Sequence, residues 1–379
     1  MPTTPDNPSK FPPRDPAGDW APPIVAARRA WTGRSLPHVA GLPVPTATAA
    51  GNIEGMIGYA QTPLGIAGPI DVRGDLEGAF LVPLATTEGS LVASYQRGIK
   101  VCNAAGGILT RILRDGLVVW PTLAFDDVDH ALAAARHVEQ HRAALVAAAE
   151  ATTAHGRVVS LDWELLGRRL VLRLEMRTGD AHGINMVTRA AAALCALVPG
   201  PTQVLLHGHD VEKRASSVRG RGKWVVAEAR IPGELVRSAW RSTPAALVDL
   251  WTTYRLAFAR MGTCTHAIQV ANGLGAFYLA TGQDIAYLAE SAACTLTLET
   301  AGDDLYATLD LPNLHAATVG GGTGKGTAAE CQALVGVNDA RGLACVLAAT
   351  LLAGDLNLAA SFLGDDFVGV HERLGRNRP

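Results

Sequence analysis

The order of short apolar segments between residues 117 and 206 limits the folds open to this chain more than any other feature. Four segments rich in β-branched and apolar residues predict strands, at 117–125, 158–165, 169–176 and 202–206. Two Ala-rich segments between them predict helices, at 126–153 and 185–197. The resulting order β-α-β-β-α-β is that of a ferredoxin-like split βαβ unit. We therefore expect residues 113–204 to form a small domain inserted into a larger one.

The sequence on both sides of this insertion predicts a helix-rich large domain, made of residues 24–112 and 205–379. Long Ala- and Leu-rich segments would supply its core helices, at 235–262, 266–282 and 338–363. Aromatic residues are only 5% of the chain, which favours closely packed helices over a β-sandwich. The expected fold class is α+β, with smaller elements in the large domain: a short helix at 25–32, loops and strands at 52–83, and a strand at 224–231.

No part of this pattern predicts a membrane segment. The first 23 residues are rich in Pro and Asp and contain no apolar run, so they are expected to be a disordered tail and not a signal peptide. Asp355 and Asn357 interrupt the most apolar segment, and its uninterrupted part is shorter than the ~20 residues that a membrane helix needs. We expect that segment to be a buried core helix and the protein to be cytoplasmic.

Charge and cysteine usage exclude several classes of function. The formal net charge is −2, so no global basic field attracts nucleic acid or an anionic membrane. The six cysteines occur singly, without a C-x-x-C pair, which argues against a disulfide framework or a zinc site. The run H-G-H-D at 207–210 lacks a third metal ligand at a suitable spacing, and solvent-facing loop histidines are the favoured interpretation. No metal is therefore expected.

Two carboxylates stand at positions where a structural role and a functional role are both open. Glu88, in A-T-T-E-G, precedes a predicted helix and is either a partner of the helix dipole, worth ~0.3–1 kcal/mol, or a functional acid. Asp284, in T-G-Q-D, lies in an otherwise apolar helical region, where an acid is seldom found unless it is paired. The alternative for Asp284 is an N-cap for the following helix.

Two glycine-containing segments predict helix N-termini that can take a phosphate. The run T-V-G-G-G-T-G at 318–324 precedes a predicted helix at 327–334, and G-D-A-H-G-I-N-M at 179–186 opens the second helix of the small domain. The first is neither a Walker A loop, because Gly326 follows Lys325 where Ser or Thr is required, nor a G-x-G-x-x-G site. A structural turn is the alternative for the first segment, and helix capping by Asp180 or Asn185 for the second.

In their order along the chain, these segments resemble the 3-hydroxy-3-methylglutaryl-CoA (HMG-CoA) reductase family. The matching series is E-G-M-I-G at 54–58, P-L-G-I-A-G-P at 63–69, V-P-L-A-T-T-E-G at 82–89, D-A-H-G-I-N-M at 180–186, G-Q-D at 282–284 and T-V-G-G-G-T at 318–323. The resemblance covers residues 50–376, nearly the whole expected fold. It implies an NADPH-dependent reductase that converts an acyl-CoA thioester, HMG-CoA, to the alcohol mevalonate with two hydride transfers.

The resemblance also implies roles for individual residues. The catalytic set would be Glu88, Lys213, Asp284 and His371, with Lys213 aligned to within a residue or two. Cofactor-binding residues would be Asp180, His182, Gly183, Ile184, Asn185, Val319, Gly320, Gly321 and Arg376, the last beside the extra phosphate of NADPH. Substrate-binding residues would be Arg97, Arg111, Arg214 and Asn272. Because His371 lies close to the chain end, the resemblance is to the eukaryote-like class, which usually uses NADPH. A homodimer or dimer of dimers is implied, with the active site at the subunit boundary.

The residue types suit this chemistry. Hydride addition to a thioester creates an oxyanion that a lysine ammonium stabilises electrostatically. The departing CoA thiolate needs a proton, which an imidazolium such as that of His371 can donate. A protonated Glu88 would polarise the carbonyl of the intermediate aldehyde, which requires burial of Glu88 or a nearby acid such as Asp284.

The sequence departs from the family pattern mainly at positions that the resemblance links to substrate recognition. Gly55 stands where the family carries Asn, Thr252 or Arg255 where it carries Lys, and His182 where it carries Met. The runs L-H-G at 206–208 and A-I-Q at 267–269 replace the family's S-G-N and N-A-H. A reductase of a different acyl thioester, on CoA or on a carrier protein, is therefore a second hypothesis. A non-catalytic cofactor-binding relative is disfavoured because the four catalytic positions hold competent groups.

Overall fold

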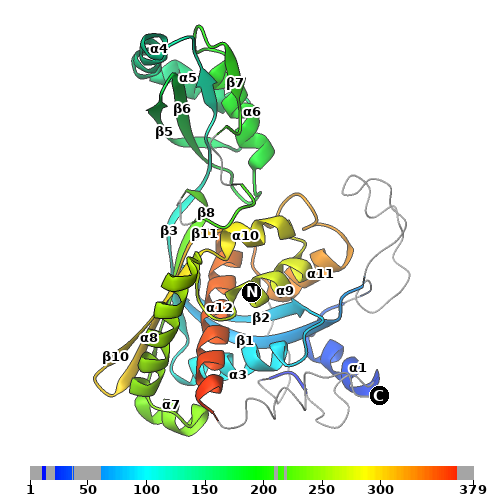
Figure 1. Cartoon of the computed structure of the whole chain (residues 1–379). Helices are drawn as coiled ribbons and strands as arrows, with labels where there is room; N and C mark the ends of the chain where they lie inside the picture. Colours follow the sequence, from blue (N-terminus) through cyan, green and yellow to red (C-terminus); the bar gives the residue numbers. More distant parts are fainter. Residues whose placement is uncertain are drawn as a thin grey trace.

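The computed structural model describes residues 11–13, 22–35, 37, 61–208, 212–216 and 220–364. Several predictions made above lie outside these residues, namely those on the segment 54–58, on His209 and Asp210, on His371 and on Arg376. Within them the chain forms a mixed α/β structure in which a large unit carries a smaller one at one end (Figure 1).

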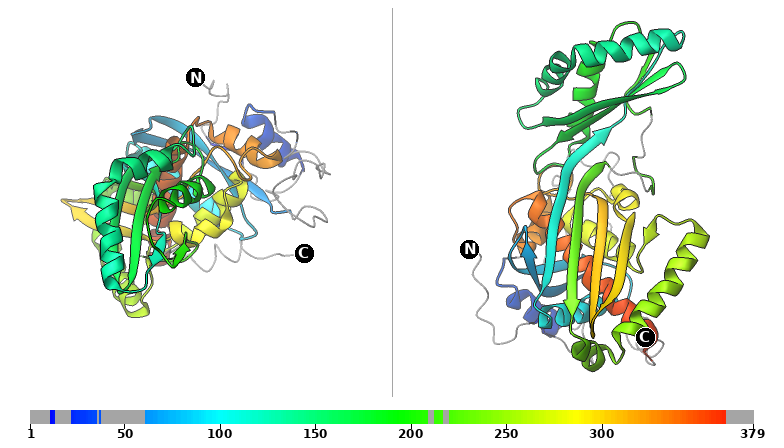
Figure 2. Two further views of the ribbon diagram at one scale, coloured as in Figure 1. Left: turned by 90° about the horizontal axis from the view of Figure 1, so that it is seen from above. Right: turned by 90° about the vertical axis from the view of Figure 1, so that its left-hand side faces the viewer.

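Among the described residues, the large unit contains seven strands of an 11-stranded sheet that runs through both units, and the sequence had predicted only some of these strands. Its strands are β1 (Leu64–Gly74), β2 (Gly78–Ala85), β3 (Ile108–Val119), β8 (Arg221–Ile231), β9 (Thr265–His266), β10 (Cys294–Ala301) and β11 (Asp304–Leu314). They lie in the order β2-β1-β3-β8-β11-β10-β9, with only the β1–β3 and β9–β10 pairs parallel (Figure 2). The region after residue 231 is helix-rich as expected, but it also contains the β10–β11 hairpin, which the sequence did not predict. Buried leucines at alternate positions, such as Leu305, Leu309 and Leu311, are the strand signal.

Helices cover this sheet and confirm most of the predicted positions. They are α1 (Pro22–Trp31), α3 (Leu91–Ala104), α7 (Gly233–Trp240), α8 (Pro244–Met261), α9 (Val270–Thr281), η2 (Ile285–Tyr287), α10 (Leu288–Ser291), α11 (Gly326–Val335) and α12 (Ala340–Leu363). The single helix expected at 235–262 is interrupted because Arg241 adopts a left-handed conformation with φ 51° and Thr243 caps a new helix at Pro244.

The apolar helix α12 is the core of the large unit. It packs against α3, α9 and β8, and by length and composition it is apolar enough to cross a membrane. However, 94% of its most apolar window is buried inside the protein, which confirms the core-helix interpretation. The polar residues that interrupt it are themselves paired: Asp355 accepts hydrogen bonds from the amides of Ile268 and Gln269, and the Asn357 side chain donates to Ser94. Buried polar groups of this kind are tolerated because they are satisfied.

The smaller unit follows the predicted order of elements. It contains β4 (Thr122–Ala124), α4 (Val128–Gln140), α5 (Arg142–Glu150), β5 (Arg157–Leu166), β6 (Arg169–Arg177), α6 (Ile184–Cys195) and β7 (Gln203–Leu205), with strand order β7-β4-β6-β5 and every neighbouring pair antiparallel. Its helices bury a separate apolar cluster against the sheet. Two boundaries differ from expectation. The helix at 126–153 breaks at His141, and the strand at 117–125 is divided at Pro121.

Strand β3 connects the two units. Its first part pairs with β8 from Leu109 to Leu117, and its last three residues, Leu117–Val119, pair with β6. The strand leaves the large sheet and enters the small one without a break, as Figure 2 shows. Most of the polar side chains of the candidate site lie near this junction.

Candidate active site

Lys213 and Asp284 form an ion pair near the junction of the units. Their Nζ and Oδ2 atoms are 3.6 Å apart, and both side chains are about half exposed. Lys213 lies in the turn 212–214 that precedes β8, and Asp284 follows the C-terminal end of α9. Asp284 is therefore not inside an apolar helix as expected. Its other oxygen, Oδ1, accepts from the amide of Ala286 and caps η2, which agrees with the alternative interpretation of this carboxylate as an N-cap.

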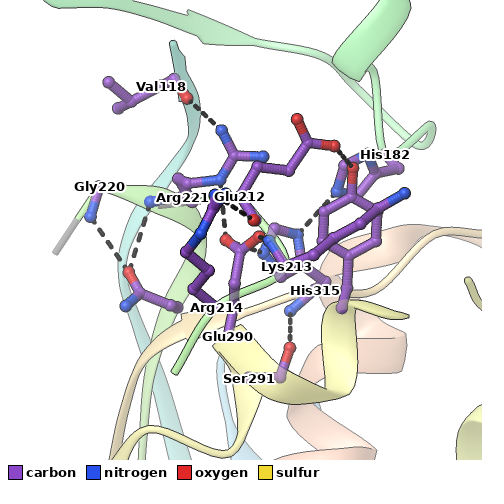
Figure 3. A network of polar contacts seen from close by, with 12 residues as sticks. Val118, His182, Glu212, Lys213, Arg214, Gly220, Arg221, Glu290, Ser291 and His315 are labelled. Atoms are coloured by element: carbon purple, nitrogen blue, oxygen red, sulfur yellow. Dashed lines mark hydrogen bonds and ion pairs between the residues drawn. The ribbon is translucent and has the colours of Figure 1, made fainter. Parts of the chain in front are cut away.

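Three further contacts hold the Lys213 turn in place (Figure 3). The Lys213 amide donates to Oε1 of Glu290 at 2.6 Å. The Tyr287 hydroxyl donates to Oε1 of Glu212 at 2.6 Å, and the Lys213 ammonium lies 5.3 Å from the centre of the Tyr287 ring. Burial, and then the hydrogen bond to Glu212, raise the pKa of Tyr287, so its hydroxyl stays a donor. Lys213 has φ 59°, a left-handed conformation that is uncommon for a residue other than glycine.

Glu290 is the centre of a buried polar network. Only 2% of the residue is exposed, and its Oε2 accepts from Nε of Arg221 at 2.7 Å and faces Nε2 of His315 at 3.1 Å. Burial alone would raise the pKa of Glu290, but the hydrogen bond from His315 and the charge of Arg221 hold it below its ordinary value. Arg221 also donates to the carbonyl of Val118 in β3, which ties the network to the strand that joins the units.

His182 extends this network into the smaller unit. Its Nε2 lies 2.9 Å from Nδ1 of His315, and both rings lie against Tyr287, with ring centres 4.0 and 4.6 Å away. Burial lowers the pKa of both histidines, so both are neutral near pH 7. The carboxylate of Glu290 can only accept, which assigns the Nε2 proton to His315 and leaves its Nδ1 to accept from His182.

Of the residues in this network only His182 was predicted from the sequence; Tyr287, Glu290, Arg221 and His315 were not. Two of these residues could have been noticed in the sequence. Glu290 lies within α10 and His315 directly follows the apolar strand β11, and ionisable residues in such settings are seldom buried unless they are paired. What could not be read from the sequence is that the two face each other.

The two segments expected to bind the cofactor lie side by side. The amides of Thr318 and Val319 both donate to the carbonyl of Asp180, and Ala181 forms an isolated parallel bridge with Val319. Helix α6 begins at Gly183 with φ 85°, and no side chain among the described residues caps it. The expected capping of this helix by Asp180 or Asn185 was wrong, because Asp180 accepts instead from the amide of Ala340 at the start of α12.

The remaining residues of the cofactor set lie on these two segments. Ile184 packs against the apolar cluster of the smaller unit, and Asn185 is exposed on the first turn of α6. Val319 is 58% exposed, and Gly320 and Gly321 have positive φ with open space where a side chain would stand. An uncapped helix N-terminus beside an open glycine loop is a favourable environment for a phosphate group.

Glu88 lies apart from the ion pair within one chain. It is exposed, and its amide donates to the Thr86 hydroxyl. The loop that carries it follows Ala85, which shares a small buried cluster with Ala280 near the end of α9. Among the described residues no hydrogen bond or ion pair joins Glu88 to Lys213 or Asp284. The burial expected to keep Glu88 protonated is therefore not present in the single chain.

The expected substrate residues are divided between the site and other surfaces. Arg214 lines an open cavity of about 540 Å³ together with His207, Glu212 and Lys213, a size that suits a small-molecule ligand. Arg97 is exposed on α3. Asn272 is exposed on the first turn of α9, ~14 Å from the C-terminal end of that helix, after which Asp284 follows.

Arg111 stands furthest from its expected role. Its guanidinium pairs with Asp75, in the turn between β1 and β2, at 2.8 Å. The assignment of Arg111 to the substrate site therefore finds no support in the contacts of the described residues.

The fold and this site define a two-unit α/β protein in which Lys213 of a lysine–carboxylate pair lines a cavity, and in which a glycine loop lies against the segment before α6. The profile of the hydroxymethylglutaryl-coenzyme A reductase family matches residues 24–376. The chain is 37% identical to 3-hydroxy-3-methylglutaryl-coenzyme A reductase of Methanothermobacter thermautotrophicus, over 91% of this chain and 90% of that protein. It is 35% identical to reductase 1 of Aspergillus fumigatus, over 86% of this chain and 30% of that protein. The chain belongs to the hydroxymethylglutaryl-CoA reductase family.

Solved structures share the fold. A class II 3-hydroxy-3-methylglutaryl-CoA reductase from Streptococcus pneumoniae, bound to NADPH in open conformations, superposes with a TM-score of 0.70 at 21% identity. The match covers 84% of this chain and 89% of that one. The α+β fold class expected from the sequence agrees at the coarser level with these structures, which share the mixed α/β architecture of this chain.

Proposed function

We propose that this protein reduces the thioester of HMG-CoA to mevalonate with two molecules of NADPH. The observation that carries the proposal is the Lys213–Asp284 ion pair, which joins two of the four residues expected to be catalytic, from separate parts of the chain, beside a cavity. Relatives that are 35–37% identical over most of this chain carry the name of that reductase.

The segments 180–185 and 318–321 fit a dinucleotide. Their backbones are bonded to each other, α6 has no side-chain cap among the described residues, and the glycine loop leaves open space. We assign Asp180, His182, Gly183, Ile184 and Asn185 with Val319, Gly320 and Gly321 to this site, and Arg376 to the extra phosphate. NADPH, when bound, supplies the hydride that reduces the carbonyl. The strand order β7-β4-β6-β5 supports a ferredoxin-like insertion at 113–204, within a large domain of residues 24–112 and 205–379.

Different side chains have different roles in the remaining steps of the reaction. The Lys213 ammonium stabilises the oxyanion that forms on the thioester carbonyl, and Asp284 holds that ammonium at the cavity. His371 protonates the departing CoA thiolate, and Glu88 acts on the aldehyde carbonyl. Arg214 supplies positive charge to the acidic substrate at the cavity wall.

Glu88, Arg97 and Asn272 support an assembly of two or more copies. All three are exposed in the single chain and none contacts the Lys213–Asp284 pair among the described residues. A homodimer, or a dimer of dimers, with the site at the subunit boundary would let one copy complete the site of another. We place the protein in the cytoplasm. We also place it in the eukaryote-like class, as the family resemblance implies.

A second substrate class is favoured by one observation. Arg111, which the resemblance places among the substrate-binding residues and whose charge would suit the distal carboxylate of HMG, is instead paired with Asp75 in the turn between β1 and β2. Without that contact the site has less reason to select a dicarboxylic acyl group, since losing a charged hydrogen bond costs ~1.5–3 kcal/mol. The alternative is reduction of another acyl thioester, bound to CoA or to a carrier protein.

Oxidation of NADPH at 340 nm tests both proposals. The purified protein is mixed with HMG-CoA and with a panel of acyl-CoAs that differ in the distal carboxylate, beside the variants Lys213→Ala and Glu88→Gln. Turnover of HMG-CoA alone, lost in both variants, is the expected result. Turnover of other thioesters alone would favour the second class. Binding of NADPH without turnover of any thioester would mean a non-catalytic relative.

A further inference from the structure

Three contacts to the Lys213 turn come from one short segment of the chain. Asp284, Tyr287 and Glu290 are spaced i, i+3 and i+6 along η2 and α10, so they lie on one face of this helical segment. Asp284 meets the Lys213 ammonium, Tyr287 lies under it and bonds Glu212, and Glu290 accepts from the Lys213 amide. The segment therefore holds the side chain and the backbone of Lys213 at the same time.

The backbone of Lys213 is strained, and the hydrogen bond to Glu290 accounts for its conformation. Lys213 is in a left-handed conformation, which costs a non-glycine residue ~1–2 kcal/mol. A strained turn of this kind persists only where its surroundings determine it. Here the determining contact is a 2.6 Å hydrogen bond from the Lys213 amide to a carboxylate, which is of the stronger, charge-assisted type.

Glu290 is itself fixed from the opposite side. Arg221, which is 1% exposed, and His315, which is 4% exposed, both face its Oε2 and leave Oε1 for Lys213. His182 then joins His315 to the segment 180–185 of the smaller unit. A continuous line of polar contacts thus runs from that segment through His315 and Glu290 to the Lys213 turn (Figure 3).

We propose that Tyr287 and Glu290 are positioning residues that hold Lys213 against the reacting carbonyl, and that the His182–His315 bridge anchors Glu290 for this task. The inference rests on the proposed function for its kinetic consequence only. Loss of position should lower kcat and leave KM nearly unchanged, because the lysine acts on charge that develops in the transition state.

Glu290→Gln breaks this contact selectively. The variant has one oxygen and one amide nitrogen where the carboxylate has two acceptors. Arg221 is the stronger donor and will take the oxygen, so the amide NH₂ will face the Lys213 N–H and repel it. Tyr287→Phe is the independent variant, since it keeps the ring under the ammonium and removes only the bond to Glu212.

Matched controls exist elsewhere in the chain. Glu175 is another buried glutamate that pairs with an arginine, and Tyr306 donates to Glu228 at 2.8 Å as Tyr287 does to Glu212. Neither lies in the network around Lys213. Glu175→Gln and Tyr306→Phe therefore report what loss of such a bond does to the protein in general.

The experiment measures all four variants in two ways. Steady-state kinetics with HMG-CoA give kcat and KM, and limited acetylation followed by peptide mass spectrometry gives the rate at which Lys213 is labelled relative to Lys100. Circular dichroism establishes that each protein is folded. We expect kcat to fall ~10- to 100-fold in both positioning variants, with Lys213 labelled severalfold faster and both controls unchanged.

The labelling separates this inference from the proposed function. If the wild-type protein turns over no thioester, the function fails, and the labelling rate of Lys213 still decides whether the residues position it. Wild-type labelling and wild-type kcat in folded Glu290→Gln and Tyr287→Phe would overturn the inference. If Glu290→Gln does not fold, Tyr287→Phe alone decides.

Discussion

The imidazole rings of His182 and His315 are joined by one hydrogen bond. Nε2 of His182 donates to Nδ1 of His315, and the two atoms are 2.9 Å apart. His182 comes from the loop before α6 in the smaller unit, and His315 from the end of β11 in the large one. Because Glu290 accepts from the far side of His315, the pair is held in a single neutral arrangement. Together with the hydrogen bonds that Asp180 accepts from Thr318, Val319 and Ala340, this contact connects the two units at the candidate site.

The first prediction concerns acid stability. The pKa values of both histidines lie below their unfolded value of 6.5, burial being the main cause. Their contribution to stability is therefore complete above pH 6.5 and is lost as the pH falls below it, because the unfolded chain binds protons first. Each buried histidine adds a slope of up to ~1.4 kcal/mol per pH unit. Urea unfolding between pH 5.5 and 7.5 should show a smaller slope in His315→Gln than in the wild type.

His130 provides the control for this measurement. It is fully exposed, and its hydrogen bond with Asp127 raises its pKa. Its effect on the pH dependence therefore has the opposite sign, and His130→Gln should not reduce the slope. Equal slopes for the wild type and His315→Gln would show that the pair is not neutral in the folded protein.

A second prediction concerns Asp355, in the middle of α12. Burial raises its pKa from 3.8 to about 6, although two backbone amides donate to it. Since the folded value is higher than the unfolded one, its contribution is complete below pH 3.8 and is lost as the pH rises through 6. Asp355→Asn cannot ionise, so the stability difference between variant and wild type should shift by up to ~3 kcal/mol in favour of the variant between pH 4 and 7.5. Urea unfolding at both pH values measures it, and a pH-independent difference would contradict it.

A third prediction separates Arg111 from substrate binding. The guanidinium is half exposed and its partner Asp75 lies in the turn between β1 and β2. Arg111→Ala should therefore leave KM for the acyl-CoA unchanged and should cost the fold ~1 kcal/mol or less, as is usual for an exposed pair. Arg214→Ala, which alters the cavity wall, should raise KM. A rise in KM for Arg111→Ala equal to that for Arg214→Ala would restore the role that the family resemblance implied.

The sequence predicted those parts of the structure that depend on local patterns. The order of strands and helices from β4 to β7 follows from periodicity and turn residues, and α12 follows from its length and its two interrupting polar residues. The break at His141 and the hairpin at 294–314 were missed. The sequence around His141 favours a helix on both sides and contains no stop signal. The hairpin at 294–314 alternates buried and partly exposed residues, but it lies in a region dominated by helices.

The candidate site divides in the same way. Lys213 and Asp284 were named as candidates because their surrounding residues resemble a family, and the structure brings the two side chains together. Glu290, His315 and Arg221 were not named from the sequence. Their contacts depend on how β8, β11 and α10 pack in three dimensions. A buried ion pair leaves no periodic signal, and single charged residues in apolar surroundings do not identify their partners.

The last prediction tests the start of α6 as part of the cofactor site. Gly183 has φ 85°, and a side chain added there would collide with Thr178. Gly183→Ala should therefore both strain the backbone and push the first turn of α6 out of position, which would weaken NADPH binding ~10-fold or more. Gly167, in the β5–β6 turn, has φ 58° and open space around it. Gly167→Ala should therefore lose only the ~1–2 kcal/mol of backbone strain and bind NADPH as the wild type does. Fluorescence titration with NADPH and thermal unfolding measure the two effects separately, and equal NADPH affinities for both variants would remove α6 from the cofactor site.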